Sequence, residues 1–289
     1  MVLNGRILTW KASKLITGLP RIVSGNGVWL TDDHNKQYFD LTSQAVCCNL
    51  GHTTSDITID RITSQLKTLP FVYGGLASIP IVEKLVFKMA EITPSHMTGF
   101  LFPSSGSEAN EAAIRIARLY TGKRDIVTVA SSYHGGTALS LASGADDRRK
   151  YVIGDVNDVV QLDHIALTID EICNYLTVNR GTIAAFLFES IIGSGGVYKH
   201  SDDWMKSISD TCKENDILMI SDEVMSGFGR CGRMWAHERY NESRKYGSFL
   251  KPDIMTFAKG FTSSILPMSG VALSSKLHNH YQTNSIGYG

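Results

Sequence analysis

Lys259 is the residue whose position most favours covalent chemistry. It ends the mostly apolar run Ile254–Ala258 and is followed by Gly260. Most lysines are solvated surface groups, but a lysine that enters a cleft at the end of a strand loses water, and this loss disfavours the charged ammonium. The neutral amine is the form that attacks a carbonyl carbon in Schiff-base chemistry. Lys259 is therefore the first candidate catalytic residue.

Two adjacent carboxylates, Asp222 and Glu223, follow the apolar run Ile217–Ile220. Paired carboxylates at a strand end can bind a metal or exchange protons with a substrate. The sequence around them has no histidine cluster and no Asp-x-Asp spacing, which disfavours a metal. One buried carboxylate could instead hold a proton on a ring nitrogen of a ligand. The structural alternative is a helix cap before the glycine-rich stretch Gly227–Arg230.

A Gly/Ser-rich turn precedes the predicted helix 107–120. Its residues Ser105, Gly106 and Ser107 would offer hydroxyls and free backbone N–H groups, and the helix dipole favours an anion such as phosphate there. A simple N-cap made by Ser105 or Ser107 explains the same residues equally well. The turn has neither the Gly-Lys-Ser/Thr of a Walker loop nor GxGxxG spacing.

An aromatic residue and a histidine follow the apolar run Ile126–Ala130. Tyr133 could lie flat on an aromatic ligand with His134 beside it, although an aromatic side chain at a strand end more often lies at the rim of a core. The sequence contains no GxSxG and no HExxH motif, so it does not favour a serine hydrolase or a zinc protease.

These residues must be positioned by an α/β fold. Helical periodicity over 80–92 and 107–120 alternates with short apolar runs, which predicts a mainly parallel sheet covered by helices. Ligands of such sheets bind beyond the carboxyl ends of the strands, where the candidate residues lie. Residues 22–41 instead predict a small antiparallel meander. The strands predicted for the sheet are 100–102, 126–130, 183–188, 217–220, 254–257 and 271–273.

Composition limits the partners of the chain. With 289 residues, 43% hydrophobic and 19% charged, it can form a sizeable core, and its net charge of +0 does not favour nucleic acid or an anionic membrane. No apolar run is long enough to span a bilayer. The 5 cysteines predict a reducing compartment, hence the cytoplasm. The basic residues Arg6, Lys11, Lys14 and Arg21 leave a mitochondrial presequence as the alternative.

Taken together, the segments resemble the class III, fold-type I family of pyridoxal-phosphate (PLP) aminotransferases, close to the ω-amino acid–pyruvate type. The resemblance covers nearly the whole chain, and its most specific part is the order Asp-Glu-Val, Gly-Phe-Gly-Arg and Lys-Gly. The segments that carry it are Ser43–Val46 with Asn49–His52, Ser105–Glu111, Tyr133–Gly135, Glu189 with Gly195–Val197, Ile220–Val224 with Gly227–Arg230, Ala258–Gly260 and Leu266–Gly270.

The resemblance implies PLP as cofactor and a role for each residue. Lys259 would form the Schiff base with PLP and act as general base, and Asp222 would pair with the pyridine nitrogen. Val224 and Tyr133 would pack on the two ring faces, and Gly106 and Ser107, with Ser105, would bind the phosphate. His134 and Glu189 are implied to lie near the cofactor. The substrates would be an amino donor and a keto-acid acceptor, and the assembly a homodimer.

The resemblance also implies a division of the chain. Residues 1–50 would belong to a small domain, residues 51–289 would form the PLP-binding large domain, and the C-terminal part of the small domain would be absent. In the family, the C-terminal part of the small domain carries the arginine that binds a substrate carboxylate. Two alternatives therefore stay open: a catalytically inactive truncated PLP-binding fragment, and another PLP enzyme such as an aminomutase or racemase.

Overall fold

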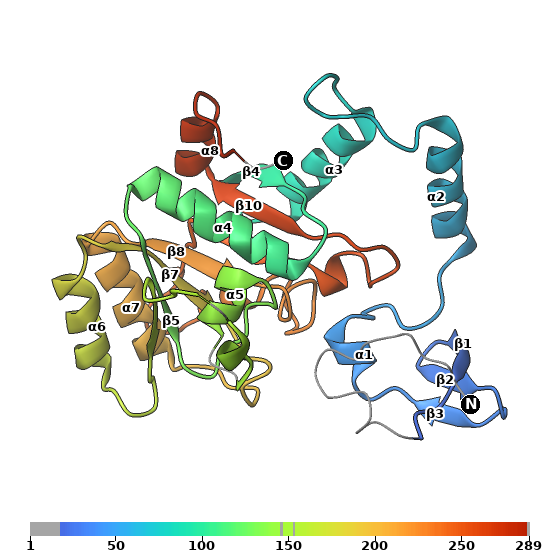
Figure 1. The fold of residues 1–289 in the computed structure, drawn as a ribbon, viewed down its shortest axis with the longest axis horizontal. Helices are drawn as coiled ribbons and strands as arrows, with labels where there is room; N and C mark the ends of the chain where they lie inside the picture. The colour runs from blue at the N-terminus through green and yellow to red at the C-terminus, as the bar shows by residue number, and fades with distance from the viewer. Residues whose placement is uncertain (1–17, 145–146, 153, 288–289) are drawn as a thin grey trace.

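The computed structural model describes residues 18–144, 147–152 and 154–287 (Figure 1). The basic residues Arg6, Lys11 and Lys14 lie outside the described residues. The strands are β1 (Ile22–Asn26), β2 (Trp29–Asp32), β3 (Gln37–Phe39), β4 (Met97–Leu101), β5 (Asp125–Val129), β6 (Val159–Leu162), β7 (Ile183–Glu189), β8 (Leu218–Asp222), β9 (Ile254–Phe257) and β10 (Gly270–Ser274). The helices are α1 (Ser43–Val46), α2 (Asp56–Thr68), α3 (Pro80–Ile92), α4 (Gly106–Thr121), α5 (Ala138–Ser143), α6 (Ile169–Val178), α7 (Asp202–Glu214) and α8 (Ser275–Tyr281).

The predicted α/β architecture is confirmed. A 7-stranded sheet has the order β4-β10-β9-β8-β7-β5-β6, and the neighbours from β9 to β6 pair in parallel. The predicted strand 271–273 corresponds to β10, which runs antiparallel to both β9 and β4. The physical reason is the connection: no helix crosses over between β9 and β10, so the chain turns back beside the strand it has left. The sequence did not predict β6, a short edge strand interrupted by Gln161.

Helices cover both faces of this sheet. The side chains of Leu218 and Ile220 pack with α4 and α8 on one face, whereas Met219, between them, packs with α6 and α7 on the other. This alternation is the period of two that a strand imposes on its side chains. The predicted helices 80–92 and 107–120 are present as α3 and α4. No helix in the described part of the chain has both the length and the apolarity that a membrane span requires.

The N-terminal part of the described chain, from residue 18 through the loop that carries Phe71 and Leu76, lies beside this body. We call this segment the arm. The predicted meander is present as the 3-stranded antiparallel sheet β1-β2-β3, and Figure 1 shows it together with α2 set apart from the large sheet. The four residues of α1 all have φ between 49 and 64°, so this segment is a left-handed turn. Asn49 then connects the arm to the body, because its amide donates to the carbonyl of Phe228 at 3.1 Å and its Oδ1 accepts from Arg230.

A buried histidine links the stability of the fold to pH. His200 is 3% exposed and stacks on Trp204, with ring centroids 3.7 Å apart, and its Nε2 has no hydrogen-bond partner among the described residues. Burial, with the nearby His164 and Lys199, lowers the pKa of His200 to about 3. The unfolded chain binds a proton at this residue below a pH of about 6.5, whereas the folded chain does not. Stability is therefore lost as the pH falls.

We predict that replacing His200 with phenylalanine flattens this acid dependence. Between a pH of about 6 and 4, His200 alone contributes about 1.4 kcal/mol of lost unfolding free energy per pH unit. Phenylalanine keeps a ring against Trp204 but binds no proton, so the slope should decrease by about that amount. Urea denaturation of both proteins across this pH range measures it, and equal slopes would show that His200 is protonated in the folded state.

Candidate active site

The carboxyl ends of the central strands and the start of α4 enclose one cavity. Eight of the nine residues that the sequence singled out line it, and they come from α4, from the last residues of β7 and β8, and from the segments that follow β5, β8 and β9. They are Gly106, Ser107, Tyr133, His134, Glu189, Asp222, Val224 and Lys259. The ninth, Ser105, is the N-cap of α4, where its hydroxyl accepts from the amide of Glu108 at 3.3 Å. Gly135, Ser194, Met225 and Ala258 also line the cavity.

Lys259 enters this cavity directly after β9. Its backbone has φ of 41°, in the left-handed region, which costs a non-glycine residue on the order of 1–2 kcal/mol. Strain of this kind persists where the surrounding structure fixes the chain, and here buried Phe257 and Ala258 precede the residue. The side chain is half-buried and makes no hydrogen bond or ion pair with the described residues. The amine is therefore available to a ligand.

Asp222 is held by three donors at the bottom of the cavity. Its Oδ1 accepts from the amide of Val224 at 2.9 Å, and its Oδ2 accepts from Asn110 and from His134, each at 2.8 Å. Because a carboxylate only accepts, the proton of a neutral His134 must sit on Nδ1, and its Nε2 accepts from Thr128 at 3.1 Å. These donors replace the water that the carboxylate, only 3% exposed, has lost on burial.

Asn110 is a hydrogen-bond partner of Asp222 that the sequence analysis did not single out. It is 1% exposed in the first turns of α4, and its amide nitrogen donates both to Asp222 and to the carbonyl of His134, at 2.8 and 2.6 Å. Its oxygen accepts from Thr256 of β9 at 2.7 Å. The sequence signal was an amide on the helix face that carries Ala113 and Ala117, where an unpaired polar group would be costly.

Glu223 points to the opposite face of β8 from Asp222. It does not line the cavity but is fully buried, and its oxygens accept from Ser226, from the amide of Ala236, and from the backbone amide and Nδ1 of His237. Burial raises its pKa, but the hydrogen bonds from His237 and Ala236, together with the charge of His237, outweigh burial, so the net shift of the pKa is downward. The two carboxylates thus do not form a pair. The described residues contain no group of three metal-ligating side chains.

Glu189 holds together the two loops that form one wall of the cavity. Its Oε1 accepts from the amide of Tyr133 at 2.8 Å, and its Oε2 accepts from the amide of Gly193 at 2.9 Å. Burial raises its pKa, and the negative charge of Asp222 adds to this rise against the opposing effect of the two amides. Glu189 thereby positions Tyr133.

The start of α4 presents donors to the cavity. The amides of Gly106 and Ser107 are in the first helical turn, where they have no intrahelical partner, and no hydrogen bond among the described residues uses them. The hydroxyl of Ser107 accepts from the amide of Gly136 at 3.0 Å and keeps its own proton to donate. A Cβ at Gly106 would lie 2.8 Å from Val224, so only glycine lets this turn approach Val224 so closely. The arrangement fits a small dianion such as phosphate.

The whole described chain matches one family model. Residues 17–288 match the model described as aminotransferase class-III. The chain belongs to the class-III aminotransferase family. It is 33% identical over 245 residues to an acetylornithine aminotransferase from Oceanobacillus iheyensis, covering 83% of this chain and 57% of that protein. It is 28% identical to an omega-amino acid–pyruvate aminotransferase from Pseudomonas putida, covering 97% of this chain and 66% of the relative.

Solved structures of aminotransferases share the fold. A taurine:2-oxoglutarate aminotransferase from Bifidobacterium kashiwanohense, in complex with PLP and glutamate, has a TM-score of 0.88 and 28% identity, over 98% of this chain and 66% of its own. A transaminase from the marine bacterium Virgibacillus has a TM-score of 0.87, with the same coverage and identity. The chain thus spans 57–66% of the length of these relatives.

Removing the amide of Asn110 is expected to destabilise the fold. In Asn110→Ala a buried carboxylate loses one donor and Thr256 loses its acceptor, which should lower the free energy of unfolding by about 1–3 kcal/mol. Asn284→Ala is the matched control, because that asparagine is exposed and its loss should cost less than about 0.5 kcal/mol. Urea denaturation at neutral pH measures both, and similar losses in the two variants would contradict this account of the network.

Proposed function

We propose that this chain is the cofactor-binding part of a PLP-dependent transaminase, which moves an amino group from an amino acid or ω-amine to a 2-keto acid such as pyruvate. The observation that carries the proposal is a single cavity with three features: the unpartnered amine of Lys259, the buried carboxylate of Asp222 and the start of α4. The names of the relatives support the reaction class, since they include an omega-amino acid–pyruvate aminotransferase.

The residues of the cavity fit PLP group by group. The free amides of Gly106 and Ser107, with the hydroxyl of Ser107, would bind the phosphate. Val224 and Tyr133 would contact the ring, and the missing Cβ at Gly106 leaves room for Val224. Asp222, oriented by its three donors, would pair with the pyridine nitrogen and hold a proton on it. When bound, PLP supplies a sink for the electrons of the substrate Cα–H bond.

Lys259 would then perform the protein's share of the chemistry. Its amine would hold the cofactor covalently, and the free amine would act as the general base that takes the proton from the substrate carbon. Glu189 would keep Tyr133 in place through its backbone amide, and Asn110 and His134 would keep Asp222 oriented. Pre-positioned groups of this kind need no rearrangement during the reaction.

A second candidate is a PLP-binding chain without turnover. The chain spans only 57–66% of the length of its relatives, so groups that the whole protein supplies to the substrate can lie outside it. An aminomutase or racemase would use Lys259 and Asp222 in the same way, and the products distinguish it. For the compartment we propose the cytoplasm, supported by five cysteines that are all free thiols.

The test is covalent capture of the cofactor and transfer of its amino group. Wild-type protein mixed with PLP, reduced with borohydride and digested should carry a pyridoxyl phosphate on the peptide of Lys259. Lys259→Ala should carry none, whereas Lys84→Ala, an exposed lysine on α3, should label as wild type. With β-alanine and pyruvate, wild type should form alanine, and Lys259→Ala should be slower by about 10²–10⁴-fold, the usual contribution of a general base.

The outcomes separate the candidates. Labelling of Lys259 together with alanine formation supports the transaminase. Labelling without any product supports the PLP-binding chain without turnover. An amino group that moves within one substrate, with no keto acid released, supports an aminomutase. Absence of label from Lys259 in the wild type would overturn the assignment of the cofactor.

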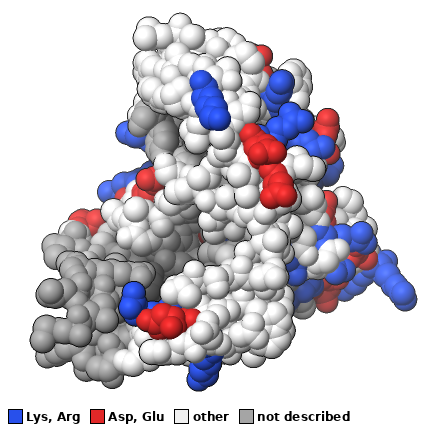
Figure 2. Space-filling view, turned by 90° about the vertical axis from the view of Figure 1, so that its right-hand side faces the viewer, with Lys and Arg blue, Asp and Glu red and all other residues white. Residues whose placement is uncertain are grey.

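We also propose that the arm is buried in a homodimer and that residues 1–50 belong to a small domain. Figure 2 shows the side of the molecule that carries the arm, and charged side chains are sparse over the middle of that face. α2 has no buried residue, and Phe71 and Leu76 in the following loop are 79% and 84% exposed. Apolar surface of this extent is typical of an interface.

A charge in this surface is expected to weaken the dimer. Leu76→Asp should raise the dimer dissociation constant about tenfold or more, since burying an unpaired carboxylate in an apolar interface is costly. Ile165→Asp is the matched control, because Ile165 is 82% exposed but lies outside the arm. Sedimentation velocity over a range of concentrations measures both. A monomeric wild type, or equal weakening by both changes, would contradict the proposed interface.

A further inference from the structure

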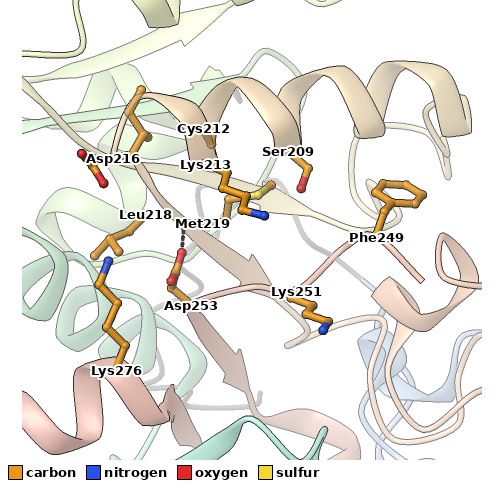
Figure 3. Close-up of a pocket in the computed structure, with 11 residues that line it drawn as sticks. Ser209, Cys212, Lys213, Asp216, Leu218, Met219, Phe249, Lys251, Asp253 and Lys276 are labelled. Carbon is orange, nitrogen blue, oxygen red and sulfur yellow. Dashed lines mark hydrogen bonds between the residues drawn. The ribbon is translucent and has the colours of Figure 1, made fainter. Parts of the chain in front are cut away.

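A second cavity lies at the amino ends of the strands, opposite the carboxyl ends where Lys259 lies. It has a volume of about 270 Å³ and is formed where β8 and β9 begin, between the end of α7 and the start of α8. Figure 3 shows its lining residues. Cys212, Leu218, Met219 and Phe249 give it apolar walls. None of the residues proposed for the amino transfer lines it.

Three lysines from three different elements line this cavity. Lys213 comes from the end of α7, Lys251 from the loop before β9 and Lys276 from the start of α8 (Figure 3). Among the described residues none of the three makes an ion pair. Lys199 and Lys245, by contrast, both pair with aspartates at 2.9 and 2.8 Å. The cavity is thus lined by three ammonium groups, and no carboxylate of the described residues forms an ion pair with them.

Two carboxylates line the same cavity without cancelling this charge. Asp216 is exposed to solvent at the rim. Asp253 lies deeper, its Oδ2 accepting from the amide of Met219 at 2.9 Å, and burial raises its pKa against the opposing effect of Lys276. A raised pKa lowers the cost of protonating Asp253 when an anion approaches. The lining is therefore positive overall, with three ammonium groups against two carboxylates.

We propose that this cavity binds a small organic anion with at least two negative charges, a dicarboxylate or a phosphomonoester. The lysines would bind the charged groups, and the walls formed by Leu218, Met219 and Phe249 would contact the carbon body. A site of this kind is distinct from the substrate cavity, which lies at the other end of β8. The proposal goes beyond the transamination proposed above and does not depend on it.

The test measures the reactivity of single lysines in the wild-type chain. The protein is labelled with a limiting amine-acetylating reagent, with and without succinate in one arm and glycerol phosphate in another, at constant ionic strength. Mass spectrometry of peptides gives the rate at each lysine. Lys213, Lys251 and Lys276 should be protected about threefold or more, because a bound anion favours their unreactive charged form. Lys67 and Lys84, exposed on α2 and α3, are the internal controls and should change little.

A double variant checks that protection comes from this cavity. In Lys213→Gln with Lys251→Gln, protection of Lys276 should disappear, whereas Lys67→Gln with Lys84→Gln, which removes the same charge elsewhere, should retain it. Protection by one probe only would identify whether carboxylates or phosphate are bound. Unchanged rates with both probes, or equal protection of Lys67 and Lys84, would overturn the proposal. Capture of PLP on Lys259 is read at a different residue, so either proposal can fail without the other.

Discussion

The candidate site depends on the hydrogen bonds that the buried carboxylate of Asp222 accepts. Removing a carboxylate from water costs several kcal/mol unless donors replace the lost hydration. Here the donors are the amide of Val224 and the side chains of Asn110 and His134, which come from α4 and from the loops after β5 and β8. Their own remaining hydrogen bonds reach Thr128 and Thr256. This one hydrogen-bond network therefore fixes α4, β5, β8 and β9 relative to one another.

The geometry of the sheet places neighbouring residues in different surroundings. Asp222 and Glu223 are adjacent in sequence, but successive side chains of a strand point to opposite faces, so only Asp222 reaches the cavity. Glu223 instead binds the segment that carries Ala236 and His237 to the body. The sheet also places Lys259. β9 ends beside β8, and Lys259, whose backbone is strained, follows directly after β9.

The two ends of β8 and β9 differ in chemistry as well as position. At their carboxyl ends the chain presents the free amides of α4 and a half-buried lysine, an arrangement suited to a phosphate-bearing cofactor. At their amino ends three lysines and the half-buried Asp253 surround a separate cavity with apolar walls. The arm contributes little to either, because most of its large apolar side chains face solvent. In the homodimer proposed above, a partner chain would cover this surface.

The sequence by itself determined the fold class and the family, and eight of the nine residues that it singled out line the cavity. Apolar runs of strand length define the sheet, and chemistry placed directly after a run must lie at its carboxyl edge. Only the tertiary structure decided the rest. β10 runs antiparallel, and Asn110 is a partner of Asp222, which lies 112 positions away in the chain. Such contacts depend on which strands become neighbours, and no local pattern of residue types encodes that order.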